Sequence, residues 1–384
     1  MNRIRQIILL FALIVPILTA CGNQAADSPA SSTATVSPGA STSGDGVDRS
    51  KLSDELYFYN WSDGIDPEIL ELFEQEYGVR VIYDTYDSNE ALIAKLRAGN
   101  SGYDIAVPTD YAVQIMVEEA LVQPLDKSLL TNLRHIDPNS LGIYFDPENR
   151  YSVPYLHLMT GIAYNREFFP NGVDSWAALF DPANLPAIQG KFSMLDDERE
   201  TPGAALQFLG QSYNTTDPAL LQQVQDLLIA QKPFLAAYNS SDVNRKLASG
   251  EYLIAHAWSG TAMQARNGLG DEFSGNPAID FVIPKEGGSI GVDNLVILDN
   301  APNAYTAHVF INFLMRPEIA ARNAVYTGFI TPNKDAVPLL PQEVQDLYAA
   351  GFAPNEELLK RLEWTKRSAE TAVFADLWTA VKGE

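Results

Sequence analysis

The feature that most constrains the fold is a regular alternation of predicted strands and helices after residue 54. Short runs rich in β-branched and aromatic residues are followed by segments with apolar residues at helical spacing. Strands separated by helices of about 10–15 residues favour parallel pairing, with helices on both faces of the sheet. We therefore predict an α/β fold. A body of roughly 330 residues is large for a single core, so we also predict two lobes.

Capping residues mark the ends of several predicted elements. Asp66 and Pro67 predict the start of a helix, and Gly78 predicts its end. Asp217 and Pro218 predict a second helix start of the same kind. The predicted strands cover residues 55–60, 79–86, 103–107, 160–164, 191–195, 252–257 and 279–283.

The first fifty residues are predicted to lie outside this fold. Residues 1–20 combine a basic start with an apolar stretch that is typical of a signal peptide and too short to span a membrane. The run Leu18-Thr19-Ala20-Cys21 resembles a bacterial lipobox, and we expect Cys21 to be lipidated. An ordinary secretory signal with a chance cysteine is the alternative. Residues 21–50 have the composition of a flexible linker, so we expect a protein of the periplasm or cell surface, lipid-anchored to a bacterial membrane.

Charge and cysteine content narrow the classes of ligand. The chain has 26 basic and 49 acidic residues, a formal net charge of −23. This excess argues against a nucleic-acid partner, which needs a basic face, and favours a cationic ligand. The single cysteine excludes an intrachain disulfide and a cysteine zinc site. No phosphate-binding or dinucleotide-binding motif is present, and we expect no cofactor.

Aromatic and acidic residues recur directly after the predicted strands, where open α/β sheets bind their ligands. Carboxylates pair with ammonium groups, and aromatic faces attract cations by about 0.5–2 kcal/mol. A slot with aromatic walls and acids at both ends would suit a linear diamine or polyamine. Each acid taken alone is also explained by a helix N-terminus, and each tryptophan by core packing. The candidate residues are Trp61, Ser62, Asp63, Thr109, Tyr111, Asp197, Glu200, Trp258 and Asp293.

At these positions the chain resembles the periplasmic polyamine-binding proteins, the spermidine/putrescine-type components of bacterial ABC importers. The resemblance covers residues 54–384. It rests on several runs together, none of which is specific alone: YNWSD (59–63), YDTYDSNE (83–90), AVP (106–108), LDKSLLTN (125–132), LDDERE (195–200), IPKEGG (283–288), INFLMRPE (311–318) and TPN (331–333).

The resemblance implies a periplasmic-binding-protein fold with a hinge between two lobes, each a mainly parallel sheet flanked by helices. Lobe 1 is expected at 54–158 plus about 288–328, and lobe 2 at 159–287 plus about 329–384.

The resemblance also assigns roles to the candidate residues. Asp293 matches the central amine-binding aspartate, and Asp197 and Glu200 match acids that hold further amino groups. Asp63 stands where the family has Glu or Asp. The remaining matches are aromatic walls and polar lining: Trp61, Tyr111, Trp258, Ser62 and Thr109.

Several positions depart from the family pattern. Gly64 and Gly291 stand where aromatic residues are usual, and Phe329 replaces a tyrosine and so loses a phenol donor. Thr365 replaces a glutamine and is followed by Lys366 and Arg367. The departures leave open a bulkier ligand, or one that carries both an amine and a carboxylate, such as 4-aminobutyrate or a basic amino acid.

We therefore predict a monomeric binding protein, not an enzyme, that captures putrescine or spermidine by hinge closure and delivers it to the permease and ATPase of an ABC importer. A ligand-sensing lipoprotein is an alternative with the same fold. Residues 287–291 match the G-x-S-x-G pattern of hydrolases, but the expected strand–turn–helix context is missing. An acidic metal site at 196–200 matches no calcium-loop spacing and contains Arg199.

Overall fold

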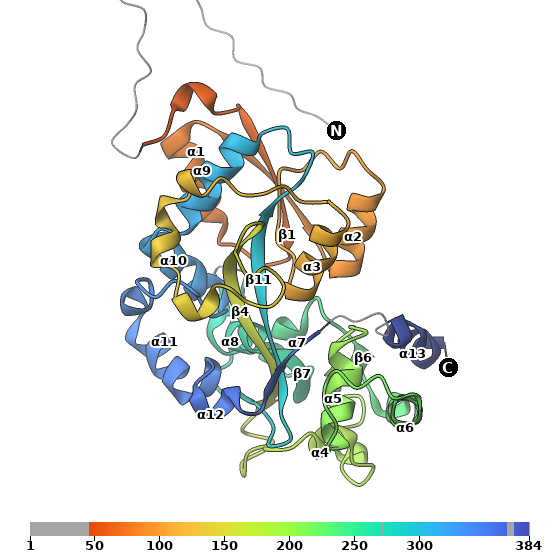
Figure 1. The fold of residues 1–384 in the computed structure, drawn as a ribbon. Helices are drawn as coiled ribbons and strands as arrows, with labels where there is room; N and C mark the ends of the chain where they lie inside the picture. Colours follow the sequence, from red (N-terminus) through yellow and green to blue (C-terminus); the bar gives the residue numbers. More distant parts are fainter. Residues whose placement is uncertain (1–45, 271, 367–371, 384) are drawn as a thin grey trace, which may run out of the picture. The chain divides into compact units, whose positions relative to one another are not determined.

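Two long antiparallel strands, β4 (Ser152–Asn165) and β11 (Gly288–Ile297), run through the middle of the sheet (Figure 1). The computed structural model describes residues 46–270, 272–366 and 372–383, which belong to one unit, Thr42–Glu384. The predicted signal peptide, the lipidated Cys21 and most of the predicted linker therefore lie outside the described residues. Among the residues described, no helix has the length and apolar character needed to cross a membrane.

Parallel strands lie on both sides of this central pair. The strand order is β2-β1-β3-β11-β4-β7-β5-β6, with β10 paired to β4 and β12 paired to β11. The β1/β2, β1/β3, β5/β6, β5/β7 and β11/β12 pairs are parallel, while the pairs that join β4 and β11 to the outer strands β3, β7 and β10 are antiparallel. The other strands are β1 (Glu55–Trp61), β2 (Arg80–Tyr86), β3 (Ile105–Ala106), β5 (Phe192–Met194), β6 (Ala237–Tyr238), β7 (Ile254–Trp258), β8 (Gly268–Leu269), β9 (Phe273–Ser274), β10 (Ile279–Val282) and β12 (Leu362–Trp364).

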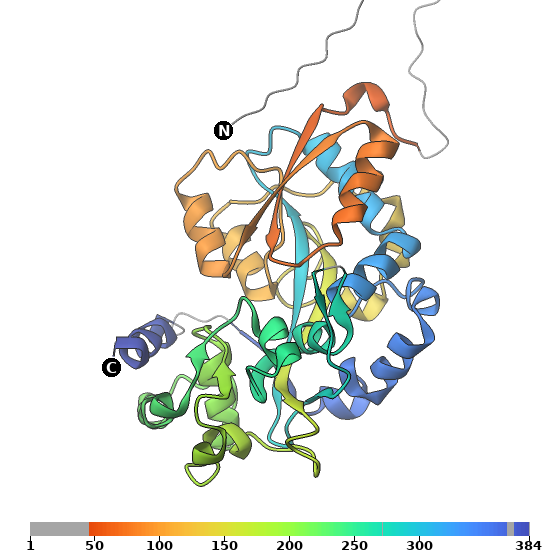
Figure 2. The same ribbon diagram turned by 180° about the vertical axis from the view of Figure 1, so that it is seen from behind.

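Helices flank the sheet on both faces, as Figures 1 and 2 show from opposite sides. We call the half built on β1–β3 the first lobe and the half built on β5–β7 the second lobe. The helices are α1 (Pro67–Tyr77), α2 (Asn89–Arg97), α3 (Asp110–Glu118), α4 (Ala177–Phe180), α5 (Glu200–Phe208), α6 (Pro218–Gln231), α7 (Val243–Ser249), α8 (Ser259–Asn267), α9 (Ala304–Leu314), α10 (Pro317–Thr327), α11 (Gln342–Leu347), α12 (Glu356–Leu359) and α13 (Ala372–Gly383).

The capping predicted from sequence is present in α1. The Asp66 carboxylate accepts a hydrogen bond from the Glu68 amide at 2.9 Å, and Pro67 occupies the first helical turn. Gly78 ends the helix in the left-handed conformation, at φ +72°. An N-cap of this kind stabilises a helix by about 1 kcal/mol. The helix start predicted at Asp217 and Pro218 is confirmed in the same way by α6.

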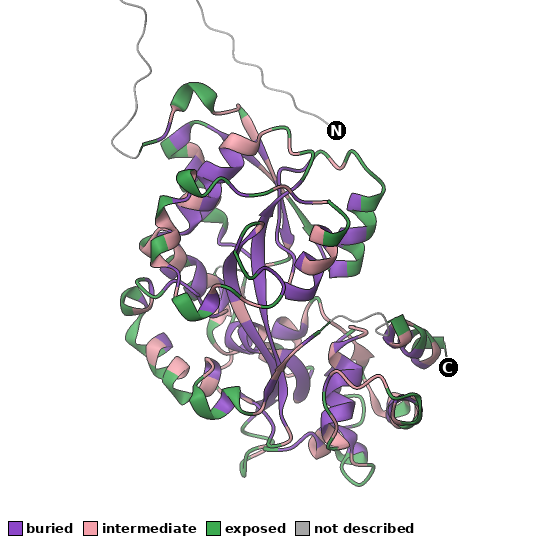
Figure 3. Ribbon diagram, in the orientation of Figure 1, coloured by how far each residue is buried: buried purple, intermediate pink, exposed green. Residues whose placement is uncertain are grey.

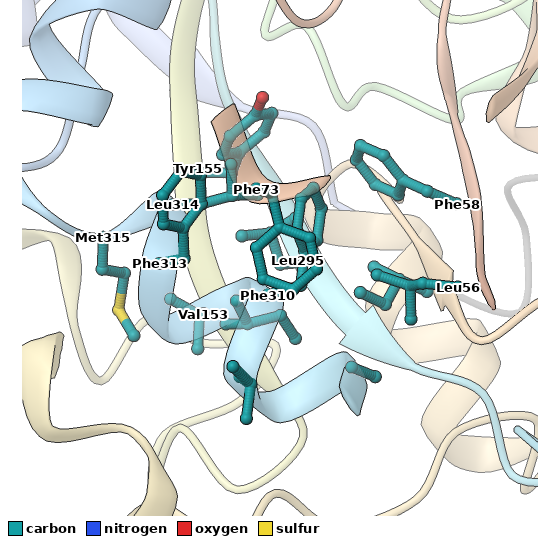
Figure 4. Close-up of a cluster of buried hydrophobic side chains, with 14 of the residues drawn as sticks. Leu56, Phe58, Phe73, Val153, Tyr155, Leu295, Phe310, Phe313, Leu314 and Met315 are labelled. Carbon is teal, nitrogen blue, oxygen red and sulfur yellow. The ribbon is translucent and has the colours of Figure 1, made fainter. Parts of the chain in front are cut away.

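A group of phenylalanines packs within the aliphatic core of the first lobe (Figure 4). Phe58 of β1 meets Phe310 of α9 edge-on at 5.3 Å between ring centroids, and Phe73 of α1 meets Phe310 at 4.8 Å. All three side chains are fully buried. Each aromatic pair contributes about 0.5–1.5 kcal/mol beyond area burial, so α1 and α9 are held firmly on one face of β1.

The second lobe has its own core on the other side of the central strands. Trp176, Phe180 and Phe192 are buried there, and the α13 residues Phe374 and Trp378 pack into the same cluster. The central strands β4 and β11 are buried along nearly their whole length (Figure 3). The two cores are thus joined mainly through backbone that both lobes share.

A bulge interrupts the pairing of the two central strands. Asp293 lies opposite Leu156, but Asn294 lies opposite Pro154, so the register shifts between Asp293 and Asn294. Proline has no amide hydrogen and is tolerated in a sheet only at edges and bulges. The Asn294 amide instead donates to the Pro108 carbonyl at 2.9 Å. The bulge therefore ties β11 to the end of β3.

The predicted α/β class is confirmed, and most outer strands are parallel as expected. The antiparallel centre was not predicted, and the strand β11, which begins at Gly288, was not among the predicted strands. The hydrolase alternative fails at the same place, because Ser289 lies inside this strand and no helix follows it directly. The predicted lobe boundaries stay a prediction.

Candidate functional site

One cavity between the lobes is lined by all ten residues predicted for the site. Trp61 ends β1, Thr109 and Tyr111 stand at the start of α3, and Trp258 ends β7. The carboxyl ends of β1, β3 and β7 lead into residues that line this cavity, as expected for the strands of an α/β sheet. The ten residues are Trp61, Ser62, Asp63, Thr109, Tyr111, Asp197, Glu200, Trp258, Asp293 and Phe329.

Asp293 is a buried carboxylate without a cation. Asp293 lies beside the bulge between β4 and β11 and is 8% exposed. Oδ1 accepts a hydrogen bond from Thr109 Oγ1 at 2.7 Å. Among the described residues, no Lys, Arg or His nitrogen lies within 4.0 Å of it. Burial raises the pKa of Asp293 to about 7, and the Thr109 bond opposes this only in part.

Asp197 and Glu200 form a second acidic group at the start of α5. The Asp197 carboxylate accepts hydrogen bonds from the amides of Arg199 and Glu200, at 2.7 and 2.8 Å, so it also serves the helix start. Glu200 accepts a hydrogen bond from Ser289 Oγ at 2.9 Å and one from the Tyr213 hydroxyl. Burial, and then the proximity of Asp197, raise the pKa of Glu200. The pair resists ionisation unless a cation joins it.

Asp63 differs from the other acids because a cation is already beside it. Its Oδ2 lies 3.3 Å from Arg245 Nη1, which comes from α7 in the second lobe. Asp63 adopts φ +55°, a left-handed conformation that is uncommon outside glycine. Burial raises the pKa of Asp63, while Arg245 lowers it.

Aromatic residues form the walls of the cavity. Trp61 donates its indole N–H to the Val107 carbonyl at 2.8 Å and packs against Tyr86 at 4.7 Å between ring centroids. Its ring is therefore fixed rather than free to rotate. Phe329 packs directly on Gly260, where a Cβ atom would come within 2.4 Å of the phenylalanine ring. Glycine is thus required at position 260 to hold this wall.

The polar lining near α3 is linked by hydrogen bonds. Asn89 accepts from the Thr109 amide at 3.1 Å and donates to the Tyr111 hydroxyl at 3.1 Å. The Tyr111 hydroxyl donates to Glu90 at 3.0 Å. Burial raises the pKa of Glu90 to about 7, and Asp197 adds to this. Glu90 is thus a further acidic group near the cavity that was not among the predicted acids.

The two glycine departures have different structural meanings. A Cβ atom at Gly291 would make ordinary contacts, at 3.4 Å to Leu158 and 3.5 Å to Thr109, so a side chain can be accommodated there. A Cβ atom at Gly64 would lie 3.0 Å from the Asn60 side chain and from the Trp61 carbonyl. Gly64 is therefore also needed for a tight turn, which sequence reasoning did not show.

The C-terminal departures lie outside the cavity lining. Thr365 is buried, and its carbonyl accepts a hydrogen bond from Tyr144 at 2.8 Å. Lys366 is exposed, and its amide donates to Asn214. Neither residue lines the cavity. Arg367 lies outside the described residues.

Sequence reasoning missed two arginines at the site. Arg199 lines the cavity, is 5% exposed, and stacks on Phe374 at 4.4 Å from the ring centroid. It stands inside the LDDERE run, which could have drawn attention to it. Arg245 follows no strand and belongs to no motif, so no signal in the sequence marks it. Within the described parts of the chain, no cluster of three or more metal-binding side chains is found, including at the acidic run 196–200.

Comparison with known proteins shows which family the chain belongs to. A model of the family described as bacterial extracellular solute-binding protein matches residues 68–351. The chain belongs to this family. A putrescine/cadaverine-binding protein of Pseudomonas aeruginosa is 36% identical over 345 residues, which cover 88% of this chain and 96% of the relative. A spermidine/putrescine-binding periplasmic protein of Escherichia coli is 39% identical over 333 residues, 85% of this chain and 91% of the relative.

Solved structures support the same fold for this solute-binding protein. A putative spermidine/putrescine ABC transporter protein from Listeria monocytogenes superposes with a TM-score of 0.78 at 39% identity, covering 86% of this chain and 99% of that one. A lipoprotein of Treponema pallidum superposes with a TM-score of 0.73 at 30% identity, covering 86% of this chain and all of the other. The family resemblance and the two-lobed periplasmic-binding-protein fold expected from sequence are confirmed.

Proposed function

We propose that this solute-binding protein captures a polyamine between its lobes. The observation that carries the proposal is Asp293, a buried carboxylate with no cation beside it among the described residues. A buried unpaired carboxylate is costly, and a ligand ammonium would remove that cost. Asp197 and Glu200 offer a second ammonium site, and Trp61 and Trp258 offer faces that attract cations. The relatives named above as binding proteins for putrescine, cadaverine or spermidine agree with this chemistry.

Capture would proceed by closure of the lobes. Asp197 and Glu200 stand on the second lobe, while Thr109 belongs to the first lobe and orients Asp293 on the shared strand β11. A ligand with one ammonium at Asp293 and another at the Asp197/Glu200 pair would contact both lobes at once. The ligand favours the closed form because only that form brings both sites onto it. The closed protein would then be read by the permease and ATPase of an ABC importer, and we propose no catalytic step.

The anchor and location remain part of this proposal. Cys21 follows a lipobox-like run, and one structural neighbour is described as a lipoprotein. Two acyl chains on Cys21 would hold the protein stably at a membrane. The predicted linker is shorter than 21–50, because Val47 is buried in the core of the first lobe and the Asp48 amide donates to the Tyr305 hydroxyl. We propose a monomer tethered through the segment between Cys21 and Val47, in the periplasm or at the cell surface. Growth with radiolabelled palmitate tests this, with Cys21→Ala as the control that should carry no label.

A second ligand class is favoured by Arg199. Its Nε lies buried without a hydrogen-bond partner among the described residues, although its other nitrogens contact the Lys366 carbonyl and Asn214. A ligand carboxylate would satisfy this donor while its amine binds Asp293. Such a ligand would be an amino acid such as 4-aminobutyrate or arginine.

Thermal-shift and calorimetric titration of the purified protein separates these readings. The panel contains putrescine, spermidine, 4-aminobutyrate, arginine and glutamate. A ligand at about 100 times its dissociation constant adds about 2.7 kcal/mol to the free energy of unfolding, which is readily measured. Binding of putrescine or spermidine alone supports the polyamine proposal. Binding of the amino acids alone overturns it in favour of the second class.

A further inference from the structure

Arg245 places a built-in cation at one end of the cavity. Its guanidinium reaches from α7 to the Asp63 carboxylate on the β1–α1 loop, at 3.3 Å between Nη1 and Oδ2. Its other terminal nitrogen contacts Glu272, between β8 and β9. The same guanidinium lies 5.4 Å from the centroid of the Phe273 ring. Arg245 is therefore held from three sides, with Asp63 as its contact in the first lobe.

The acids of the cavity thus fall into two kinds. Asp293, Asp197 and Glu200 have no basic nitrogen within 4.0 Å among the described residues, whereas Asp63 has one. The electrostatic surroundings are also separate. The charges around Asp63 are those of Arg245, which lowers its pKa, and Glu272, which raises it. Asp197 raises the pKa of Glu200, while Arg199 lowers and Asp196 raises the pKa of Asp197. Asp63 is thus neutralised by a direct ion pair, whereas Arg199 acts on Asp197 without one.

We propose that Arg245 is a specificity-determining residue, an internal cation that occupies the amine-accepting position at Asp63 and so disfavours ligands that would place a third ammonium there. The inference rests on the proposed polyamine function and deepens it. The amines of a ligand are directed to Asp293 and to the Asp197/Glu200 pair. A diamine satisfies both of these sites, whereas a triamine that extends toward Asp63 meets a guanidinium.

We expect Arg245 to disfavour an ammonium at Asp63 at every physiological pH. A guanidinium keeps its charge at every physiological pH, and its planar fork can hold two carboxylates at once. The contact with Glu272 keeps Arg245 in place, so displacement by a ligand would break two charged contacts. An arriving ammonium would also be repelled by the like charge.

The test compares putrescine and spermidine on the wild type and on Arg245→Gln, by calorimetric titration of the purified full chain. Removing the guanidinium frees Asp63, so we expect the ratio of spermidine affinity to putrescine affinity to rise at least tenfold. Arg245→Lys should keep the wild-type ratio, because it keeps the charge. Adding Asp63→Asn to Arg245→Gln should remove the gain, because the freed carboxylate is then absent.

The matched control is Lys246→Gln, which removes the adjacent cation of the same helix. Lys246 contacts Asp242, Glu251 and Tyr252, none of which lines the cavity. Its variant should leave the ratio unchanged. An Arg245→Gln ratio within threefold of the wild type would overturn the inference, as would an equal loss of affinity for both ligands. A wild type that binds neither polyamine would instead refute the proposed function itself.

Discussion

Substitution of Asp293 by Asn is the sharpest test of the site. The two side chains have nearly the same shape, and Asn can still accept the hydrogen bond from Thr109 that measures 2.7 Å in the wild type. The change therefore removes a charge while the bulge between β4 and β11 keeps its geometry. Since Asp293 is 8% exposed and carries no other cation among the described residues, a bound ammonium depends on that charge.

The expected loss can be estimated from this environment. Truncating one partner of a buried, hydrogen-bonded charge pair costs about 2–5 kcal/mol. The amide oxygen of Asn still offers a neutral acceptor to the ammonium, which places the cost at the lower end, about 2–3 kcal/mol. At about 1.4 kcal/mol for each factor of ten, putrescine affinity should fall by about 30- to 150-fold.

Calorimetric titration with putrescine at pH 8 measures this loss. The pH is chosen because burial raises the pKa of Asp293 to about 7, so the carboxylate is ionised in the wild type at pH 8. Asp299→Asn is the matched control, because Asp299 is exposed just beyond the same strand. A fall of threefold or less in Asp293→Asn, equal to that of the control, would remove Asp293 from the site and refute the reasoning.

Three further predictions concern the same cavity. The putrescine affinity of the wild type should weaken about tenfold between pH 8 and pH 6, because protonation of the Asp293 carboxylate, with a pKa of about 7, removes the charge that holds the ammonium. In Asp293→Asn, the tenfold change in affinity that is due to this group should be absent. Gly260→Ala should lower the free energy of unfolding by about 1–3 kcal/mol and weaken binding, because its Cβ would lie 2.4 Å from the Phe329 ring. Denaturant unfolding tests this, with Gly383→Ala at an exposed position as the control. Equal stability of the two variants would contradict the prediction. Gly291→Trp should tighten putrescine binding by about two- to thirtyfold through cation–π attraction of about 0.5–2 kcal/mol. Unchanged or weaker binding in calorimetry would show that this position does not contribute an aromatic wall to the binding site.

Much of the candidate site could be predicted because its residues are tied to strand ends. Trp61 and Trp258 each end a strand, and a reader of the sequence can find strand ends from apolar runs followed by polar residues. The helix start at Asp66 was equally visible from capping chemistry. Capping and strand-end patterns depend only on residues that are close in the sequence, so they can be predicted without knowledge of the fold.

The central strands could be predicted only in part, because the predicted strand at 160–164 covers the end of β4 and its earlier residues, 152–159, were not predicted. β4 is buried along nearly its whole length and shows no alternation, and Pro154 within it argues against a strand. Only pairing with β11, more than 100 residues later in the chain, explains why a proline is tolerated there. Arg245 was missed for a related reason. Its partner Asp63 lies 182 residues away, and nothing in the local sequence of α7 announces the contact.

Pro154 and Asp293 together explain how a buried acid comes to lie where both lobes meet. Proline cannot donate to the ladder, and it lies at a bulge where Asp293 and Asn294 of β11 face Leu156 and Pro154 of β4, leaving Tyr155 as the extra residue. The shift sends the Asn294 amide to Pro108 and leaves the Asp293 side chain against Thr109, in the cavity. A cation bound to Asp293 thus acts on the strand that both lobes share.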